Sequence, residues 1–358
     1  MTHCLDLNRR RMLAGVAGTF ALSQLGAGAA AAQNTVAPLS LTKPFAPIAG
    51  PRSRVVYVND VSGDPDGFFA TVHQILSPTA ELRSLIGTLA GGKGETASRS
   101  TELLNDIVRI MDRQGRIKVH EGAANKMPGA GTPVRSAGTQ AIIDEALRTD
   151  TKLPLYVAVG GGLTEVASAV MIEPRIADRF TLVWIGGDAL PDGGSGETNF
   201  NIDPLAAQFL FNETNVEIWQ ITRAVYRTCL VSATEIQAFV APHGEIGAWL
   251  YDRLADLNRR FGPGFNAGET WTLGDNPLVL LTALHDWNPV RTPNGLVYDK
   301  TDSSYFDEVV APRLNPDGTF TPRTEGRKIR IYRAIDNRTM LNDFFAKMRI
   351  NYPRAAGA

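Results

Sequence analysis

The chain has 358 residues, of which 44% are hydrophobic and 20% are charged. These proportions are typical of a soluble globular protein with a substantial core, and the length suits one large α/β domain or two smaller ones. The formal net charge is −1, which excludes the basic surface that binds nucleic acid.

The first 32 residues have the features of an export signal. Arg9, Arg10 and Arg11 precede a mildly apolar stretch and an Ala-rich end, which is the order found in cleavable signals. Paired arginines are typical of the twin-arginine route, so we expect the twin-arginine export machinery to be a partner. The alternative, a membrane anchor, needs about 20 apolar residues, and this stretch is shorter. We expect cleavage near Ala32, no stable membrane anchor, and an exported, periplasmic or secreted protein.

Residues 33–52 are rich in Pro, Ala and Gly and predict an irregular lead-in. A single domain is expected over residues 53–350, followed by a short tail at 351–358. Once the signal is removed, Cys229 is the one remaining cysteine, so no intramolecular disulfide can form. Its apolar neighbours predict a buried, inert thiol.

From residue 53 onward, strand-like and helix-like segments alternate. Continuous apolar runs predict strands at 54–58, 82–89, 116–122, 153–159, 180–187 and 216–221. Helical spacing predicts helices at 66–76, 101–111, 139–148, 163–171 and 204–212. This alternation predicts an α/β fold: a doubly wound, mostly parallel open sheet with helices on both faces. After about residue 240 the pattern is more helical, and it ends with the helical segment "MLNDFFAKMRI".

Three carboxylates, Asp60, Asp64 and Asp66, fall within seven residues after the first predicted strand. Ligands bind at the carboxyl ends of strands in such sheets. Three anions this close repel one another unless protons or a cation intervene, and oxygen donors favour Ca²⁺ or Mg²⁺. The alternative for Asp64 is a helix cap before Pro65, but this alternative leaves the other two carboxylates unexplained.

The segment "VNDVSGDPDGFFA" resembles the N-terminal signature of the inosine–uridine nucleoside hydrolase superfamily, which is an apolar strand followed by Asp-x-Asp-Pro-Gly-x-Asp-Asp and a helix. It is closest to a variant written Asn-Asp-Phe-Ser-Gly-Asp-Pro-Asp-Gly. Four further segments resemble family segments in the same order: "LPLYVAVGGGLTEVASAV", "FTLVWIGGDA", "ETNFNIDPLAAQFLF" and "LGDNPLVLLTAL". The resemblance covers about residues 53–285.

The resemblance implies a hydrolase that cleaves the N-glycosidic bond of nucleosides or related glycosides with a Ca²⁺-activated water. It implies that Asp60 is a metal ligand and the general base. Asp64 and Asp66 match the closing aspartate pair, of which one binds metal and the other a ribose hydroxyl. The carbonyl of Val159 and the carboxylate of Asp275 match the remaining metal ligands.

For the sugar, the resemblance implies binding by Asn199 and Asn201, with Asn199 at a position where relatives have Glu. The chain departs from purine-specific relatives at Gly274, where they have a His that protonates the leaving base. His285 follows ten residues after Asp275 and is expected at the end of the same helix, away from that role. The base then leaves unprotonated or stacks on an aromatic residue such as Trp271.

Two other functions compete with the hydrolase. A non-catalytic, metal-dependent nucleoside- or sugar-binding protein on the same fold is favoured by the missing acid, whereas the retained carboxylates favour the hydrolase. A periplasmic solute-binding protein requires two similar lobes, and the sequence has no internal repeat. Relatives form homodimers or homotetramers, but no segment of this chain marks an interface.

Overall fold

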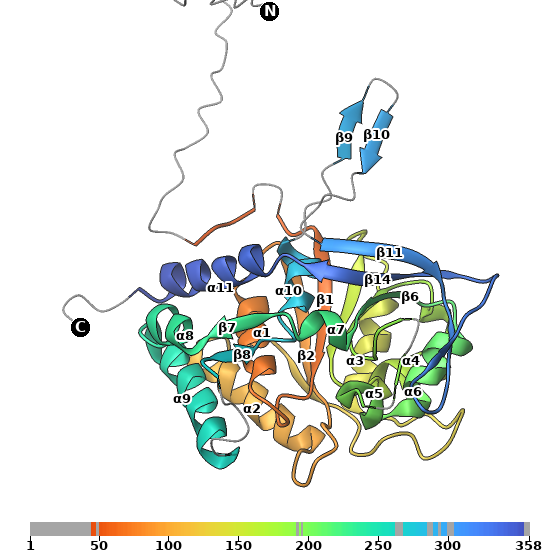
Figure 1. Ribbon diagram of the computed structural model, residues 1–358, viewed down its shortest axis with the longest axis horizontal. Helices are drawn as coiled ribbons and strands as arrows, with labels where there is room; N and C mark the ends of the chain where they lie inside the picture. The colour runs from red at the N-terminus through yellow and green to blue at the C-terminus, as the bar shows by residue number, and fades with distance from the viewer. Residues whose placement is uncertain are drawn as a thin grey trace, which may run out of the picture. The chain divides into compact units, whose positions relative to one another are not determined.

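The computed structural model describes residues 44–47, 50–190, 193–194, 196–261, 268–284, 289–292, 295–298 and 304–353 (Figure 1). The predicted export signal, most of the lead-in and His285 lie outside these residues. The described part of the chain belongs to one compact unit that spans residues 41–358. Within the ranges given above, no helix combines the length and the apolar character needed to cross a bilayer.

The centre of the fold is an eight-stranded sheet in the order β11-β14-β6-β5-β4-β1-β2-β3. Every neighbouring pair is parallel except β11 and β14, which are antiparallel. The predicted doubly wound, mostly parallel sheet is therefore confirmed. The strands are β1 Ser53–Asn59, β2 Ala80–Gly87, β3 Val119–Glu121, β4 Leu155–Gly160, β5 Thr181–Ile185, β6 Glu217–Ile221, β11 Ser304–Val310 and β14 Lys328–Ile335.

The sheet is buried on both faces, because its central strands are apolar on both. In β1, Val55 and Tyr57 belong to one core cluster, and Val56 and Val58 to the other. Burying a side chain of this size contributes about 1.5–3 kcal/mol. Helices lie on opposite sides of the sheet (Figure 1). One core contains α1 Asp66–Ile75, α2 Ala97–Ile110, α9 Gly244–Phe261 and α11 Asn337–Asn351, and the other contains α3 Ala137–Ala146, α4 Thr164–Ile172 and α6 Pro204–Asn212.

The more helical region expected after residue 240 is found in α9 and α11, but strands that were not expected lie between these two helices. Seven strands, β8 to β14, lie between residues 270 and 335, and two of them extend the main sheet. In β14, Ile329 and Ile331 are buried while Lys328 is exposed. This alternation is a half-buried strand pattern, and the interleaved basic residues obscured it. The short strands are β7 Leu230–Ser232, β8 Thr270–Thr272, β9 Pro289–Thr292, β10 Gly295–Tyr298, β12 Arg313–Leu314 and β13 Phe320–Thr321.

The remaining helical segments are short and mostly follow the carboxyl ends of strands. They are α5 Thr198–Ile202, α7 Arg223–Tyr226, α8 Ala233–Phe239 and α10 Pro277–Val279, together with a 3₁₀ turn at Pro174–Ile176 and a π-helical turn at Leu280–Leu284. The segments α5, α7 and α10 all lie next to the site described below.

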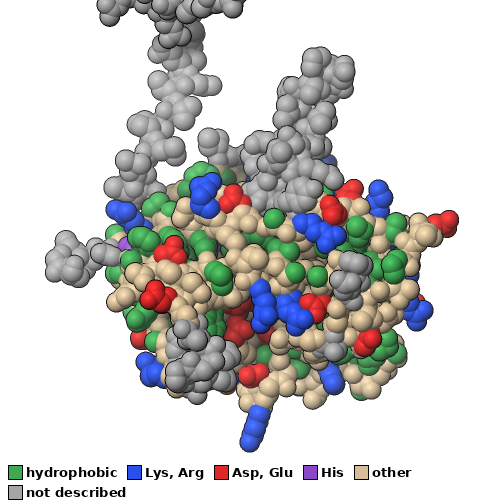
Figure 2. All heavy atoms as spheres, in the orientation of Figure 1, with side chains coloured by type: hydrophobic (Ala, Val, Ile, Leu, Met, Phe, Trp, Pro, Cys, Tyr) green, Lys and Arg blue, Asp and Glu red, His purple; other side chains and the backbone are tan. Residues whose placement is uncertain are grey.

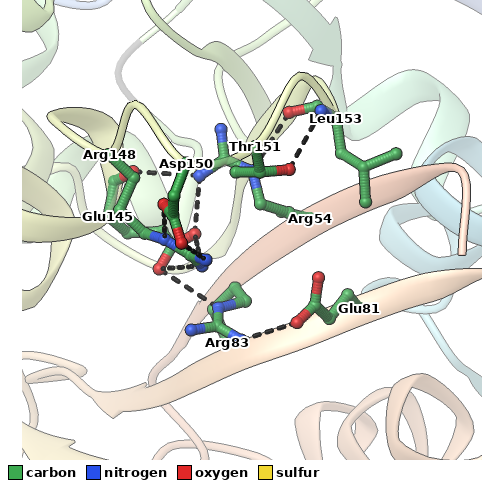
Figure 3. A network of polar contacts seen from close by, with 8 residues as sticks. All are labelled: Arg54, Glu81, Arg83, Glu145, Arg148, Asp150, Thr151 and Leu153. Atoms are coloured by element: carbon green, nitrogen blue, oxygen red, sulfur yellow. Dashed lines mark hydrogen bonds and ion pairs between the residues drawn. The ribbon is translucent and has the colours of Figure 1, made fainter.

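The amino end of the sheet is closed by an ion-pair network (Figure 3). Arg54 on β1 is buried and donates to Glu145 at 2.6 Å. The same carboxylate accepts from Arg83 at 3.1 Å and from Arg148 at 3.0 Å, and Arg148 also contacts Asp150. Removing one partner from a buried pair typically costs about 3–5 kcal/mol. The charges at this end of the sheet are therefore compensated by one another.

The carboxyl end of the sheet contains a switch point between β1 and β4. From β1 the chain continues to β2 and β3 on one side, and to β4, β5 and β6 on the other. Asn59, the last residue of β1, is level with Gly160 of β4 and Gly87 of β2. Connections that leave in opposite directions open a crevice at this point, which is where open α/β sheets bind ligands.

Candidate active site

A cavity of about 250 Å³ lies at this switch point. Figure 2 shows acidic side chains gathered in a hollow near the middle of the molecular face. The walls are mainly polar or small residues that come from the loop after β1, the start of α1, the end of β5, α5, α7 and the turn before α10. The lining residues are Asp60, Gly63, Asp64, Asp66, Ala90, Glu95, Ile185, Thr198, Asn199, Tyr226 and Asp275.

Asp60 is fixed by the backbone on both sides. Its N–H donates to the carbonyl of Gly160 at 3.1 Å, and its carbonyl accepts from the N–H of Gly63 at 2.8 Å. The turn after β4 packs closely against its side chain, since a Cβ at Gly161 would lie 3.2 Å from Asp60 Cβ and Cγ. Gly161 has a φ of +147°, a conformation that glycine adopts readily.

Asp64 and Asp66 lie at the start of α1. Asp64 Oδ1 accepts the backbone N–H of Asp66 at 3.2 Å, and Pro65 immediately precedes the first helical residue. The N-cap position of α1 is Pro65, and no side chain caps the helix, so the alternative role of Asp64 as the helix cap is not found. Both carboxylates line the cavity.

Asp275 joins these residues from a segment more than 200 positions away. It is 5% exposed, and its Oδ2 accepts from Nδ2 of Asn59 at 2.8 Å. A Cβ at Gly160 would lie 2.5 Å from both Asp275 Oδ1 and Asn59 Nδ2, so the absence of a side chain at Gly160 is what admits this contact. Asn59 is fully buried, and its Oδ1 has no hydrogen-bond partner.

The carboxylates of this cavity are strongly perturbed. Burial, followed by the charges of Asp275 and Asp64, raises the pKa of Asp60 well above its ordinary value. The same causes raise the pKa of Asp66. Burial also raises the pKa of Asp275 to about 7, although the hydrogen bond from Asn59 opposes the shift. Carboxyl groups in this state hold protons near neutral pH or require a cation to ionise together.

The cavity carboxylates are oxygen donors of the kind that a hard cation such as Ca²⁺ prefers. Their side chains do not, however, converge on one point as metal ligands do. In the described ranges, no three His, Cys, Asp or Glu side chains are grouped so as to hold a metal ion. Asp60, Asp66 and Asp275 supply the oxygen donors that Ca²⁺ prefers, and the unpartnered Oδ1 of Asn59 adds a polar atom beside them. Val159 is buried within β4 one residue before Gly160, and it is not a lining residue.

The structure separates the two asparagines expected at the sugar. Asn199 lines the cavity and donates from Nδ2 to the carbonyl of Ile185 at 2.7 Å. Asn201 is exposed and does not line it. Two residues along an α-helix correspond to a rotation of about 200°, so residues 199 and 201 of α5 point to opposite sides.

Glu197, which the sequence analysis passed over, is the acidic residue of this segment. It is fully buried and accepts the N–H groups of Gly187 and Phe200, both at 2.7 Å. Glu197 does not line the cavity; it is the N-cap residue of α5 and holds the backbone beside Asn199 in place.

Tyr226 was also missed, because "AVYRTC" carries no motif. It is the last residue of α7, lines the cavity, and donates its hydroxyl to Glu197 Oε1 at 3.0 Å. Trp271, the aromatic residue expected near the base, lies on β8 packed against the core and does not line the cavity. Cys229 is buried, as predicted, and burial raises its thiol pKa to about 12.

The chain is thus an α/β protein with a polar, acidic cavity at the carboxyl ends of its strands. The model of the family described as inosine-uridine preferring nucleoside hydrolase matches residues 66–329. The chain belongs to this family, which confirms the resemblance inferred from its motifs.

Individual relatives are distant. The inosine-uridine preferring nucleoside hydrolase of Crithidia fasciculata is 39% identical over 84 residues, or 23% of this chain and 25% of that protein. The protein of the same description from Leishmania major is 40% identical over 86 residues, or 23% and 26%. The matched segment thus spans about a quarter of the length of these relatives.

Solved structures match over far more of the chain. A purine-preferring ribonucleoside hydrolase from Gardnerella vaginalis superposes with a TM-score of 0.62 and 17% identity, covering 83% of this chain and 98% of that one. A plant nucleoside hydrolase gives a TM-score of 0.60 and 14% identity, covering 83% and 99%. At these identities the likeness establishes the fold.

Proposed function

We propose that this protein hydrolyses the N-glycosidic bond of ribonucleosides. The observation that carries the proposal is the convergence of Asp60, Asp64, Asp66 and Asp275 with Asn199 around one cavity at the switch point of the sheet. The family description and the names of the superposed structures support it.

The cavity residues suit this chemistry. Breaking an N-glycosidic bond develops positive charge on the sugar, and fixed carboxylates around that position stabilise the charge. Asp60, held between β1 and the turn after β4, is the general base that accepts a proton from the attacking water. Asn199 and the Asp64–Asp66 pair offer amide and carboxylate groups for the sugar hydroxyls. Asn59 holds Asp275 in place by a hydrogen bond.

We propose Ca²⁺ as the cofactor, held by carboxylates of Asp60, Asp275 and one of the pair Asp64 and Asp66. When bound, such a cation lowers the pKa of water and compensates the negative charge of the site. Oxygen-only donors favour Ca²⁺ over softer metals. The raised carboxyl pKa values are those expected of a cation site whose charges are otherwise uncompensated.

The proposal is tested by incubating purified protein with purine and pyrimidine ribonucleosides and measuring the release of reducing sugar. We expect release with added Ca²⁺ and its loss after treatment with a chelator. If no nucleoside is cleaved while ribose or a nucleoside still binds in the presence of Ca²⁺, the protein is a binding protein on this fold. If neither cleavage nor binding occurs, the proposed site is wrong.

We further propose that the protein is exported by the twin-arginine route. Replacing Arg9, Arg10 and Arg11 with Lys should leave unprocessed precursor in the cytoplasm, because the export machinery recognises the arginine pair. Cell fractionation and immunoblotting measure this result, and Arg52→Lys, outside the signal, is the matched control. Normal processing of the triple-lysine variant would show that another route is used.

A further inference from the structure

We propose that His73 is a positioning residue of the candidate site, and that it holds the turn carrying Asp275 through a hydrogen bond with Asn276. This inference rests on the proposed function, to which it adds a residue outside the cavity. Asp275 lines the cavity, whereas His73 and Asn276 do not. His73 therefore acts through its neighbour and takes no part in the reaction itself.

His73 is a neutral imidazole that uses both ring nitrogens. It is fully buried on α1, and burial lowers its pKa to about 4. Its Nε2 lies 2.8 Å from Oδ2 of Asp343 on α11. Burial opposes the ionisation of Asp343, but the hydrogen bond from His73 and the charge of Lys347 outweigh it and lower its pKa. Because a carboxylate only accepts, the single ring proton is on Nε2, and Nδ1 is an acceptor.

The acceptor at Nδ1 determines the orientation of Asn276. This residue is fully buried at the N-cap position of α10, and its Nδ2 donates to Nδ1 of His73 at 3.2 Å. Within the described part of the chain, its side chain makes no cap hydrogen bond, and its Oδ1 has no partner. An asparagine at an N-cap normally stabilises its helix, and a buried acceptor without a partner is destabilising. The contact that Asn276 makes in place of capping is the one with His73.

This contact joins the two segments that bring Asp66 and Asp275 together. Asp66 is the first residue of α1, and His73 lies about two turns further along the same helix. Asn276 directly follows Asp275, and a Cβ at Gly274 would lie 3.1 Å from Oδ2 of Asp66. The helices α1, α10 and α11 pack into one core on the same side of the sheet (Figure 1). The hydrogen bond between residues 73 and 276 therefore fixes the turn of Asp275 against the helix of Asp66.

Asp275 is held at two points, and His73 supplies the second. Its carboxylate accepts from Nδ2 of Asn59 on the sheet at 2.8 Å. The turn itself is closed by a long backbone hydrogen bond, from the N–H of Asn276 to the carbonyl of Leu273 at 3.3 Å. Loosening the turn should therefore displace the carboxylate. A misplacement of about 1 Å in a catalytic arrangement can cost about 10²-fold in rate.

The test uses two substitutions, each of which keeps one of the two contacts of the ring. In His73→Gln the amide reaches the position of Nε2 and donates to Asp343, but nothing replaces Nδ1. In His73→Asn the amide oxygen takes the position of Nδ1 and accepts from Asn276, while the contact with Asp343 is lost. Both substitutions should lower Tm. We expect kcat/KM on inosine to fall at least about tenfold in His73→Gln and less than about threefold in His73→Asn.

Thr282→Val is the matched control. Oγ1 of Thr282, in the π-helical turn after α10, donates to Oε1 of Gln74, the neighbour of His73, at 3.2 Å. The substitution breaks another buried polar contact between α1 and this segment without touching Asn276, so it should lower Tm and leave kcat/KM nearly unchanged. The inference is overturned if His73→Gln and His73→Asn lose activity equally, or if Thr282→Val loses as much, since either result marks a general effect of stability.

The tautomer of His73 is a readout that does not depend on activity. Nitrogen-15 spectra of metal-free protein with labelled histidine should show His73 at pH 7 as the neutral form with its proton on Nε2. The signal is assigned by its disappearance in His73→Asn. A protonated His73, or one with its proton on Nδ1, could not accept from Asn276 and would reject the arrangement.

The inference and the proposed function can fail separately. In crystal structures of metal-free protein, the distance from Asn59 Nδ2 to Asp275 Oδ2, 2.8 Å in the wild type, should exceed about 3.5 Å in His73→Gln and remain a hydrogen bond in His73→Asn. If the wild type cleaves no nucleoside, the proposed function fails, and this comparison decides the inference. An unchanged distance in His73→Gln rejects the positioning role, whatever the activity.

Discussion

Asp60→Asn should lower kcat on the nucleoside substrate by at least about 10³-fold. General base catalysis typically contributes about 10²–10⁴-fold, and the amide can neither accept the proton of the water nor hold a cation as a carboxylate does. The substitution nearly keeps the shape of the side chain, so its packing against Gly161 and the backbone bonds to Gly160 and Gly63 should persist. Steady-state kinetics together with the thermal unfolding profile measure the effect and check the fold.

The matched control is Asp307→Asn on β11, which removes one carboxylate that pairs with Arg333 on the surface. Exposed pairs of this kind contribute about 0–1 kcal/mol, so activity should be retained. A loss below about tenfold for Asp60→Asn would reject Asp60 as the base. A large loss for His285→Ala with a small one for Asp60→Asn would show that the late motif was aligned on the wrong aspartate, with Asp286 as the ligand in place of Asp275.

The sheet from β1 to β6 could be predicted because most of its strands are short, largely apolar runs that alternate with helices of clear periodicity. Residues Val55–Val58 of β1 are buried on both faces of the sheet. A strand of this kind is a continuous apolar run, which can be recognised in the sequence. The C-terminal strands could not be recognised from sequence. In β14, "KIRIYRAI", basic residues lie among the buried ones, and in β11, "SYFDEVV", two acidic residues follow the buried Phe306. The pairing of β14 with β6 and of β11 with β14 is tertiary and has no local signal.

Some residues of the candidate site could likewise be predicted from the sequence, and others could not. Asp60, Asp64, Asp66 and Asp275 were found because they fall in motifs at strand ends or turns. Asn59, Glu197 and Tyr226 act through contacts that the fold creates. The bonds Asn59–Asp275 and Tyr226–Glu197 join residues 216 and 29 positions apart, and no spacing rule predicts them.

Metal-free protein should lose stability as the pH rises through neutrality. Asp60, Asp66 and Asp275 have folded pKa values above the ordinary carboxyl value of about 4. The folded chain therefore binds more protons than the unfolded chain between pH about 4 and the folded pKa, about 7 for Asp275. By linkage, the free energy of unfolding falls as pH rises through this window. His73 contributes with the opposite sign at lower pH, because burial lowers its pKa to about 4.

We therefore expect Tm of chelated protein to be lower at pH 8.0 than at pH 6.5, a range in which the unfolded His73, with an ordinary pKa of about 6.5, loses only its last fraction of protons. Added Ca²⁺ at about 100 times its Kd should stabilise the fold by about 2.7 kcal/mol, or roughly 5 °C in Tm. The gain should be larger at pH 8.0, because the cation and the protons compete for the same carboxylates. Asp275→Asn is the matched variant: it removes one of the charges, so it should reduce both the pH dependence and the response to Ca²⁺. Differential scanning calorimetry measures all four conditions. A Tm unchanged by Ca²⁺ at pH 8.0 would reject the cation site, and a chelated protein more stable at pH 8.0 than at pH 6.5 would show that these carboxyl groups do not bind protons as their burial predicts.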